Sequence, residues 1–354
     1  MNHIRQIAAA LPGSGLDAML ITGRTAMLYA LGFRGEGLLL LARTGGLYIT
    51  DGRYIEEARE QVTGVEVTAC SAGEERLARA KDFLRACGLE QVGFESGTVS
   101  ADGLRALEEG LSCWLRPAQS LLDTLRLSKD EEELDAMRRA QKITDDTFQA
   151  LLPVIRPGMT ERQIAARLVF ELLDRGGEAV SFNPTVAAGP SGSKPHARPG
   201  DRVLERGMFL TLDFGCKVEG YCSDMTRTVA VGPPTDEMRA VYAAVLEAQE
   251  AGIRAARAGV TGSGMDGAAR AVLEAAGYGA FFTHNLGHCM GLENHEGPNA
   301  APNDHRPLPA GTVISVEPGV YLPGRFGVRI EDILVLREGG CENLTRSSKE
   351  LIVL

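Results

Sequence analysis

The amino-terminal third of the chain alternates apolar runs with amphipathic stretches. Aliphatic runs of strand length lie at residues 17–22, 37–42, 47–50, 65–70 and 91–96. Stretches with helical spacing of their apolar residues lie near residues 53–61, 73–87 and 101–110. Strands and helices that alternate in this way pack as layers. The pattern therefore predicts a small three-layer α/β domain with a mixed or parallel sheet.

The remaining two thirds begin with signals for long helices. The segment SKDE at 128–131 has the Ser-x-x-Glu form of a capping box and predicts that a long helix begins there. The segment TERQ at 160–163 has the same form and predicts the start of the next helix. A domain boundary is expected shortly before the first of these helices, which divides the chain into residues 1–122 and 123–354.

The second part of the chain repeats itself. RPGMT (156–160) and RAGVT (257–261) share the pattern R-x-G-x-T, and each precedes an amphipathic helix that ends in glycine. GMFLTLDFG (207–215) and GTVISVEPG (311–319) share an apolar strand, an acid six residues after the first glycine, and a glycine two residues later. Features that recur in phase over a long period indicate internal duplication. We therefore expect an α+β domain of two helix-plus-hairpin units, with helices outside a curved sheet.

Each unit contributes two acids to a candidate ligand set. Asp213 and Asp224 belong to the first unit, Glu317 and Glu331 belong to the second, and His288 lies between them in sequence. Four carboxylates and one imidazole are a ligand set for two divalent ions. Oxygen-rich ligation suits Mn(II), and the imidazole also admits Co(II), Fe(II) or Zn(II). Two such ions can hold and ionise a water molecule, as a hydrolytic enzyme requires.

Two better-known motifs fail at these positions. DFG at 213–215 has the letters of the kinase magnesium site, but no glycine-rich loop precedes it and the chain has no HRD element. The segment HNLGH, which ends at His288, has the HxxxH spacing of zinc proteases. Asn285, however, stands where their general-base glutamate belongs, and Gly287 opposes the helix that the motif needs. The five candidate ligands must therefore be interpreted together.

As a set, these segments resemble the pita-bread metallopeptidases, the family of methionine aminopeptidase, Xaa-Pro aminopeptidase and Xaa-Pro dipeptidase (prolidase). The ligand segments occur in the order of that family. The resemblance implies a pita-bread (creatinase/aminopeptidase-like) α+β catalytic domain that binds two divalent ions, with Mn(II) favoured. It implies that Asp213 binds one ion alone, and that Asp224 and Glu331 bridge both. His288 and Glu317 would complete the second ion site.

Further segments resemble the proline-specific branch of this family. KPHARP contains the histidine of a PHA element, His196, and NHEGP contains the histidine of a VHE element, His295. His284 and Arg329 match two further active-site positions. The resemblance implies that these four residues face the substrate and take part in catalysis.

The amino-terminal segment YITDGRYIEEA (48–58) resembles the creatinase-N-like α/β domain of the same branch. The resemblance implies a homodimer or a dimer of dimers, in which this domain serves oligomerisation and caps an active site. The chain departs from the family pattern at Cys289, where a glycine is usual, and at Asn294, where a valine is usual. Both residues neighbour expected functional residues, so they bear on pocket shape and metal preference.

Bulk composition is that of a globular protein and narrows the partners. The chain has 354 residues, of which 44% are hydrophobic and 24% charged. A net charge of −10 gives no support to binding of nucleic acid or an anionic membrane. The sequence shows no long apolar run and no signal peptide at its start, so we expect no membrane span and a cytoplasmic location. The seven scattered cysteines predict reduced thiols rather than a disulfide framework.

The expected substrate is a peptide with proline at its second position. Proline fixes φ and lacks an N–H, so peptidases that bind extended backbone accommodate it poorly. We predict an Xaa-Pro aminopeptidase, a dinuclear exopeptidase whose nucleophile is a metal-bridging hydroxide. The alternative is an Xaa-Pro dipeptidase, which would have to close the pocket beyond proline. A non-catalytic or creatinase-like relative is a third interpretation; such proteins have lost metal ligands, whereas all five are present here.

Overall fold

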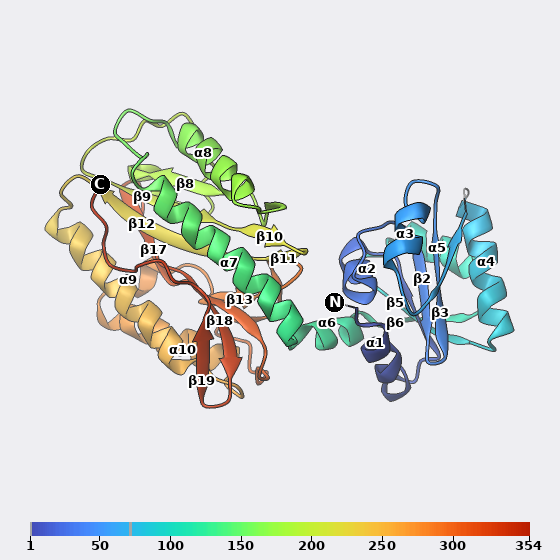
Figure 1. The fold of residues 1–354 in the computed structure, drawn as a ribbon. Coiled ribbons are helices and arrows are strands. Elements are labelled where there is room, and N and C mark those ends of the chain that lie inside the picture. Colours follow the sequence, from blue (N-terminus) through green and yellow to red (C-terminus); the bar gives the residue numbers. More distant parts are fainter. Residues whose placement is uncertain (1, 71–72) are drawn as a thin grey trace. The chain divides into compact units, whose positions relative to one another are not determined.

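The computed structural model describes residues 2–70 and 73–354. They form two compact units, Met1–Arg126 and Leu127–Leu354, which are drawn in Figure 1. The division falls at the last residues of helix α6 (Gln119–Leu127). Each unit has its own sheets and its own hydrophobic core, and each is described by itself.

The described residues of the amino-terminal unit form a six-stranded sheet in the order β4-β3-β2-β1-β5-β6. Its strands are β1 (Ala18–Ile21), β2 (Leu38–Ala42), β3 (Gly45–Thr50), β4 (Glu66–Ala69), β5 (Gln91–Phe94) and β6 (Trp114–Pro117). Its helices before α6 are α1 (Ile4–Ala10), α2 (Arg24–Leu31), α3 (Ile55–Gln61), α4 (Gly73–Ala86) and α5 (Ala101–Gly110), with a 3-10 turn at Pro12–Ser14. Strand β2 pairs antiparallel with β1 and β3, whereas β4, β5 and β6 are added in parallel. The sheet is therefore mixed, and the predicted strands and helices are confirmed; α1, α2, α6 and β6 were not predicted.

Helices cover both faces of this sheet, which explains why its central strands are apolar throughout. Leu20 and Leu40 pack in one cluster with Leu84 of α4. Met19 and Leu39 point to the other face, because successive side chains of a strand alternate, and they are equally buried. Helix α1 contacts β1 and β2 there. The three-layer arrangement expected from the sequence is thus present.

The carboxyl-terminal unit, whose residues are all described, combines long helices with short antiparallel strands. Its helices are α7 (Glu131–Leu151), α8 (Glu161–Asp174), α9 (Asp236–Ala255) and α10 (Gly262–Ala275), with 3-10 turns at Gly189–Ser193 and Gly279–Phe281. Its strands are β7 (Ala179–Val180), β8 (Thr185–Ala188), β9 (Met208–Phe214), β10 (Cys216–Val218), β11 (Tyr221–Cys222), β12 (Met225–Val231), β13 (Gly287–Cys289), β14 (Glu296–Ala300), β15 (Val313–Val316), β16 (Gly319–Leu322), β17 (Phe326–Arg329), β18 (Asp332–Arg337) and β19 (Gly340–Asn343). The five-stranded sheet has the order β14-β13-β15-β18-β19, and two three-stranded sheets have the orders β12-β9-β8 and β11-β10-β7.

Each half of this unit packs a helix pair against its own strands. In the first half, Phe148 of α7 and Leu168 of α8 share a cluster with Leu212 of β9. In the second half, Val245 of α9 joins a cluster with Ile314 of β15, which also takes in residues of α10 and β18. Figure 1 shows the helices outside the strands in both halves. This is the repeated helix-plus-hairpin arrangement that the sequence predicted.

The duplication extends to single backbone positions. Gly158 and Gly259 both have positive φ, 92° and 84°, which favours glycine in the R-x-G-x-T motif. The N–H of Gly158 donates to the Leu204 carbonyl and that of Gly259 to the Leu308 carbonyl, at 2.9 and 2.7 Å. In each motif the final threonine caps the following helix, α8 or α10. The two halves therefore repeat a local structure as well as a topology.

The first capping box lies two residues beyond its predicted place. Asp130 caps α7, because its side chain accepts from the Glu133 N–H while the Glu133 carboxylate accepts from the Asp130 N–H. The predicted cap, Ser128, instead donates its hydroxyl to the Ala310 carbonyl at 2.6 Å. A tertiary contact has thus taken the residue away from the helix. The second predicted capping box, at 160–163, is present as expected.

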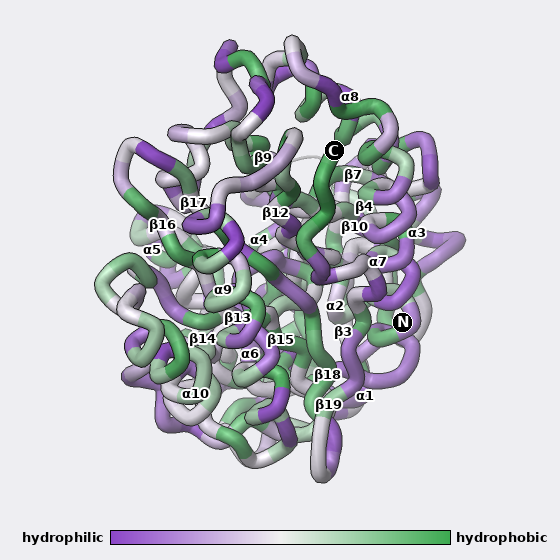
Figure 2. The backbone as a smooth tube through the Cα atoms, turned by 90° about the vertical axis from the view of Figure 1, so that its left-hand side faces the viewer, coloured by the Kyte–Doolittle hydropathy of each residue, from purple (hydrophilic) through white to green (hydrophobic). Residues whose placement is uncertain are grey.

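The end of the chain extends the first sheet of this unit. The Ala230 N–H donates to the Ile352 carbonyl, and the Leu354 N–H donates to the Ala230 carbonyl, at 2.9 and 2.8 Å. Figure 2 shows this tail as a hydrophobic segment near the label C. Its side chains Ile352 and Leu354 pack against the cluster of the first half, so the carboxyl terminus contributes to the core.

Two further expectations concern the cysteines and the absence of a membrane-spanning helix. All seven cysteines lie in the described ranges and are free thiols. Within those ranges, none of the helices combines the length and apolar character that crossing a membrane requires.

Candidate metal centre and active site

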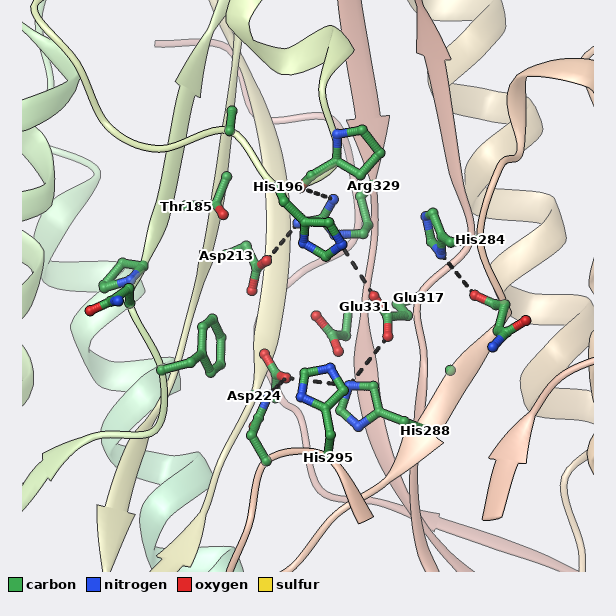
Figure 3. A pocket seen from close by; sticks show the side chains of 18 of the residues that line it. Thr185, His196, Asp213, Asp224, His284, His288, His295, Glu317, Arg329 and Glu331 are labelled. Carbon is green, nitrogen blue, oxygen red and sulfur yellow. Dashed lines mark hydrogen bonds and ion pairs between the residues drawn. The ribbon is translucent and has the colours of Figure 1, made fainter. Parts of the chain in front are cut away.

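Every residue that the sequence indicated for chemistry lines one cavity of the carboxyl-terminal unit. The cavity has a volume of about 630 Å³. Its lining includes His196, Asp213, Asp224, His284, His288, His295, Glu317, Arg329 and Glu331. Figure 3 shows these side chains converging from both halves of the unit. Residues that are far apart in the sequence are thus brought together in one place.

The four acids lie where two strand pairs meet. Asp213 is on β9 opposite Thr226 of β12, and Asp224 comes just before β12. Glu317 directly follows β15 and Glu331 directly precedes β18, so they are neighbours across that antiparallel pair. The Glu331 N–H donates to the Thr226 carbonyl at 3.1 Å, which joins the two pairs. Each half of the duplicated fold therefore supplies two carboxylates.

Two glycines allow the chain to approach itself closely beside these residues. A Cβ at Gly215 would lie 1.9 Å from the Ser223 carbonyl oxygen, and a Cβ at Gly287 would lie 2.0 Å from the Ser315 carbonyl oxygen. Any larger residue would have to push backbone away in both places. These two glycines are thus explained by close backbone contact rather than by turns.

The donor set fits a divalent cation. Asp224, His288 and Glu331 offer ligand atoms that all lie within 4.8 Å of one another. Asp224 is 3% exposed and Glu331 1% exposed. Among the described residues, Asp224 Oδ1 and Glu331 Oε1 find no hydrogen-bond partner. Buried carboxylate oxygens without a partner are costly. A bound cation would satisfy both, and carboxylates with one imidazole suit ions such as Mn(II).

The electrostatics of the metal-free site lead to the same conclusion. Burial, followed by the charges of Glu331, Asp213 and Glu317, raises the pKa of Asp224 well above its ordinary value. Burial, followed by the charges of Glu317 and Asp213, likewise raises the pKa of Glu331. For Glu317, burial raises the pKa to about 7 even though Arg329 opposes the shift. Without cations, these carboxyl groups would hold protons that a cation would displace.

His288 has the orientation of a metal ligand. Its Nδ1 lies 3.2 Å from the Cys289 carbonyl oxygen and therefore carries the proton that it donates there. Burial lowers the pKa of His288, so the neutral ring leaves a lone pair on Nε2. That lone pair faces carboxylate oxygens of Glu317 and Asp224, at 3.4 and 3.9 Å. A lone pair directed at carboxylates is unfavourable unless a cation lies between them.

Arg329 is fixed by its neighbours. It donates from Nε to the Thr226 hydroxyl, from Nη1 to the Pro195 carbonyl and the Tyr321 hydroxyl, and from Nη2 to Asp213. One bond at Nε, two at Nη1 and one at Nη2 use four of the five N–H groups of a guanidinium. The Thr226 hydroxyl in turn donates to Glu331 Oε2 at 2.7 Å. A continuous polar network therefore orients Asp213 and Glu331.

Two members of this network were missed in the sequence analysis. Thr226 lies two residues after Asp224, and such spacing along an extended chain was a usable signal for a shared face. Tyr321 lies on β16, paired with the strand that carries Arg329. Its hydroxyl is 2.8 Å from Arg329 Nη1 and from His284 Nε2. Only the pairing of β16 with β17 reveals that contact.

Both ring nitrogens of His284 are used within the protein. Nδ1 is 2.8 Å from the Asn285 carbonyl oxygen and donates to it. Burial, followed by the charge of Arg329, lowers the pKa of His284 to about 4, so the ring is neutral. Nε2 then accepts from the Tyr321 hydroxyl, which itself accepts from Arg329. A direct hydrogen bond from His284 to a substrate would require one of these contacts to break.

The remaining two histidines are more open to the cavity. The rings of His295 and His288 have centroids 4.0 Å apart. Burial, followed by repulsion from His288, lowers the pKa of His295, so that its ring is neutral near neutral pH. His196 is exposed and reaches the cavity from the loop after the 3-10 turn at Gly189–Ser193. These two imidazoles remain available to a ligand.

Comparison with known proteins agrees with the fold. Residues 135–338 match the family model described as metallopeptidase family M24, and residues 3–128 match that of the creatinase/prolidase N-terminal domain. The chain therefore belongs to metallopeptidase family M24. The predicted family and its pita-bread fold, with a creatinase-like amino-terminal domain, are confirmed.

Solved structures of similar chains include peptidases named for Xaa-Pro substrates. The chain is similar to an Xaa-Pro dipeptidase from Bacillus anthracis, with 36% identity, a TM-score of 0.95 and 99% of each chain covered. It is also similar to an X-Pro aminopeptidase from Thermotoga maritima, with 37% identity, a TM-score of 0.92, and 96% of this chain and 98% of the other covered. A Bacillus subtilis protein described as an uncharacterized peptidase is 38% identical over 342 residues, 96% of each chain.

Proposed function

We propose that the protein is a dinuclear exopeptidase that hydrolyses the bond between an amino-terminal residue and proline. The observation that carries the proposal is the buried cluster of Asp224, His288 and Glu331, in which unpaired oxygens and an imidazole lone pair converge. The similar structures from Bacillus anthracis and Thermotoga maritima are an Xaa-Pro dipeptidase and an X-Pro aminopeptidase, which supports the substrate class.

The five candidate ligands would divide between two ions. Asp213 would serve one ion, His288 and Glu317 the other, and Asp224 and Glu331 would lie between them. When bound, such ions act as Lewis acids, which lower the pKa of water and polarise a carbonyl group. Four carboxylates balance the formal charge of two dications. Because four of the five ligands are oxygen donors, we favour Mn(II), although Co(II), Fe(II) and Zn(II) fit the same set.

The two histidines that are open to the cavity would stabilise the carbonyl oxygen and transfer a proton to the leaving nitrogen. His295 and His196 can each donate an N–H to the carbonyl oxygen of the scissile bond as negative charge develops on it. Either ring can also take up the proton that the attacking water loses and pass it to the proline nitrogen, which must be protonated to leave. Arg329 would keep Asp213 in place, because four of its N–H groups are already bound by protein acceptors.

The hydrogen bonds that Arg329 already makes within the protein support an aminopeptidase rather than a dipeptidase. A dipeptidase must bind the free carboxylate of proline, and Arg329 could do so fully only by giving up contacts to Asp213 or Tyr321. One observation favours the second candidate, an Xaa-Pro dipeptidase. Arg198 also lines the cavity, and among the described residues its guanidinium has no partner. It could receive such a carboxylate.

A cleavage panel tests the proposal. Purified protein loaded with each metal in turn would be offered Xaa-Pro dipeptides, Xaa-Pro-Yaa tripeptides and longer peptides, with Xaa-Ala-Yaa as the matched control. We expect release of the first residue from the proline peptides, faster from tripeptides than from dipeptides, and loss of activity with chelator. Turnover of dipeptides alone would assign a dipeptidase. Activity untouched by chelator in metal-free protein would contradict the metallopeptidase mechanism.

We further propose that residues 1–122 serve assembly, with two or more copies of the chain associating and the amino-terminal domain capping a neighbouring active site. Support comes from the match of residues 3–128 to the creatinase/prolidase N-terminal domain. The sequence of this region also lacks a cluster of catalytic residue types.

A further inference from the structure

Glu161 joins the two ends of the loop that carries His196. It is the first residue of α8, and it is only 2% exposed. Its Oε1 accepts the N–H of Ala188, the last residue of β8, at 2.9 Å. Its Oε2 accepts the N–H of Gly200, also at 2.9 Å. One carboxylate thus binds the backbone on both sides of residues 189–199.

The start of α8 is a favourable place for a carboxylate with this role. The capping box of the helix consists of Thr160 and Gln163, so the Glu161 side chain takes no part in it. A carboxylate in the first turn interacts favourably with the positive end of the helix dipole, and hydrogen bonds to it are charge-assisted. Strand β8 lies at the edge of its sheet, so the Ala188 N–H needs an acceptor outside the sheet. Glu161 supplies that acceptor from a rigid element.

His196 depends on this loop for its position. Its side chain is exposed and, among the described residues, makes no hydrogen bond of its own. The carbonyl of the preceding residue, Pro195, accepts from Arg329 at 3.3 Å, which is long for a hydrogen bond. The backbone of the loop therefore places the imidazole in the cavity. Glu161 fixes the two ends of that backbone relative to each other.

We propose that Glu161 is a positioning residue, which holds His196 where its imidazole can act on the scissile bond. The inference rests on the proposed function, in which His196 donates to the carbonyl oxygen or transfers a proton. Glu161 does not line the cavity, so its effect passes through the loop. A displacement of about 1 Å at a reacting group can cost about a hundredfold in rate, so a small shift of the loop would be measurable.

The first test is Glu161→Gln, which changes the shape of the side chain little. The glutamine oxygen can accept one of the two N–H groups, but its NH2 group is a donor and cannot accept the other. With alanyl-prolyl-glycine, kcat should fall by about tenfold or more, though no further than in His196→Ala, while KM and metal content stay close to wild type. A tripeptide is used because its proline has no free carboxylate, so Arg198 is not involved.

A double-mutant cycle separates positioning of His196 from a general disturbance of the site. In the His196→Ala background, Glu161→Gln should change kcat by less than about twofold, because the side chain that it positions has been removed. A loss by the same factor in both backgrounds would overturn the inference. Glu161 would then act on another part of the site, such as Arg329 through the Pro195 carbonyl.

Two further variants identify a folding defect. Glu171 is a matched control, because it is also a buried acid of α8, 5% exposed and paired with Arg167 and Arg175. Glu171→Gln should lower the melting temperature and keep the wild-type kcat; a loss of kcat equal to that of Glu161→Gln would contradict the inference. Glu161→Asp keeps the charge at the helix start but is about 1.5 Å shorter, so it cannot reach both N–H groups. If Glu161→Gln does not fold, the same cycle is run with Glu161→Asp, with the same expected result.

Hydrogen exchange provides a readout that does not depend on turnover. The Lys194 and Ala197 amides donate to carbonyls within the loop, each at 3.1 Å. A peptide that contains both should exchange several times faster in Glu161→Gln than in the wild type, whereas peptides from residues 163–174 of α8 should be unchanged. Equal exchange of the loop in both proteins would overturn the inference. If the wild type cleaves no Xaa-Pro peptide, the proposed function fails, while the exchange comparison still decides whether Glu161 holds the loop.

Discussion

Glu331→Gln should stabilise the metal-free protein and remove its stabilisation by metal. Glu331 is buried and offers an atom within 4.8 Å of one from Asp224. Two unit charges at that distance repel by about 3 kcal/mol at an effective dielectric constant of about 20. Glutamine has nearly the same shape and still presents an oxygen to the Thr226 hydroxyl, which now donates to Glu331 Oε2. The change therefore removes charge and little else.

The repulsion between the two carboxylates depends on pH, because pH sets how far the carboxyl groups are ionised. Burial, then the charges of Glu317 and Asp213, raises the pKa of Glu331, and burial raises the pKa of Glu317 to about 7. A carboxyl group with a higher pKa in the folded state holds more protons when folded, so the free energy of unfolding falls as pH rises. The penalty is absent below the unfolded pKa of about 4.3 and fully present above the folded pKa. The variant should therefore gain most at about pH 8, by roughly 1–3 kcal/mol.

Divalent ions should reverse the stability difference, so that the wild type becomes more stable than Glu331→Gln. An ion that binds only the native state stabilises it by about 2.7 kcal/mol at a concentration of one hundred times its Kd. The wild type should gain this much with Mn(II), because cations replace the protons on its carboxyl groups. Glu331→Gln should gain far less, because it lacks one of the charges that hold the ions. The two proteins should thus change order of stability between chelator and metal.

Calorimetry with fluorescence separates the two units. The single tryptophan, Trp114, lies in the amino-terminal unit, so its fluorescence reports that unit and should be insensitive to the substitution. Scanning calorimetry would report the carboxyl-terminal transition. The matched control is Glu342→Gln, whose carboxylate is held by Arg138 and Arg337 with its pKa lowered to about 2. That control should lose stability with and without metal. A metal-free Glu331→Gln less stable than the wild type at about pH 8 would refute the reasoning.

Other expectations follow from the same site. His288→Ala should lose metal by elemental analysis, whereas His196→Ala and His295→Ala should keep metal and lose turnover by roughly tenfold to a thousandfold; identical behaviour of all three would contradict these roles. Arg198→Ala should lower kcat/KM for Xaa-Pro dipeptides more than for tripeptides, because only dipeptides end in a carboxylate at proline, and equal effects would exclude Arg198 as an anchor. Light scattering should give at least twice the chain mass of 37.8 kDa; a fully active monomer would contradict the assembly proposal.

The internal repeat is the reason that much of the carboxyl-terminal fold could be predicted. Gly158 and Gly259 need the same positive φ, and the acids at 213 and 317 follow the same glycine-bounded strands, so each half of the sequence supported the interpretation of the other. Agreement between local sequence patterns and the overall fold is typical of sequences that specify one fold. The amino-terminal unit had no repeat, and its short edge strand β6, which ends in Pro117, gave a weaker signal.

The contacts that orient the site could not be predicted because they join residues far apart in sequence. Thr226 and Glu331 are 105 positions apart, Arg329 and Asp213 are 116 apart, and Asn294 and Asp224 are 70 apart. Their pairing depends on the register between strands of different halves, which local patterns do not encode. The displaced capping box has the same cause, since a distant carbonyl binds the hydroxyl of the predicted cap.

The site lies where the two halves of the carboxyl-terminal unit meet, which explains why it needs residues from both halves. Each half supplies two carboxylates, so neither half alone offers the full ligand set. Arg227, 1% exposed, donates from Nη1 to the Thr226 and Glu331 carbonyls, and from Nη2 to Asp332. It also binds the Ser347 carbonyl near the carboxyl terminus. One guanidinium on β12 thereby fixes the strand that carries Glu331 without touching its carboxylate. Precise placement of repelling charges thus depends on contacts to the backbone behind them.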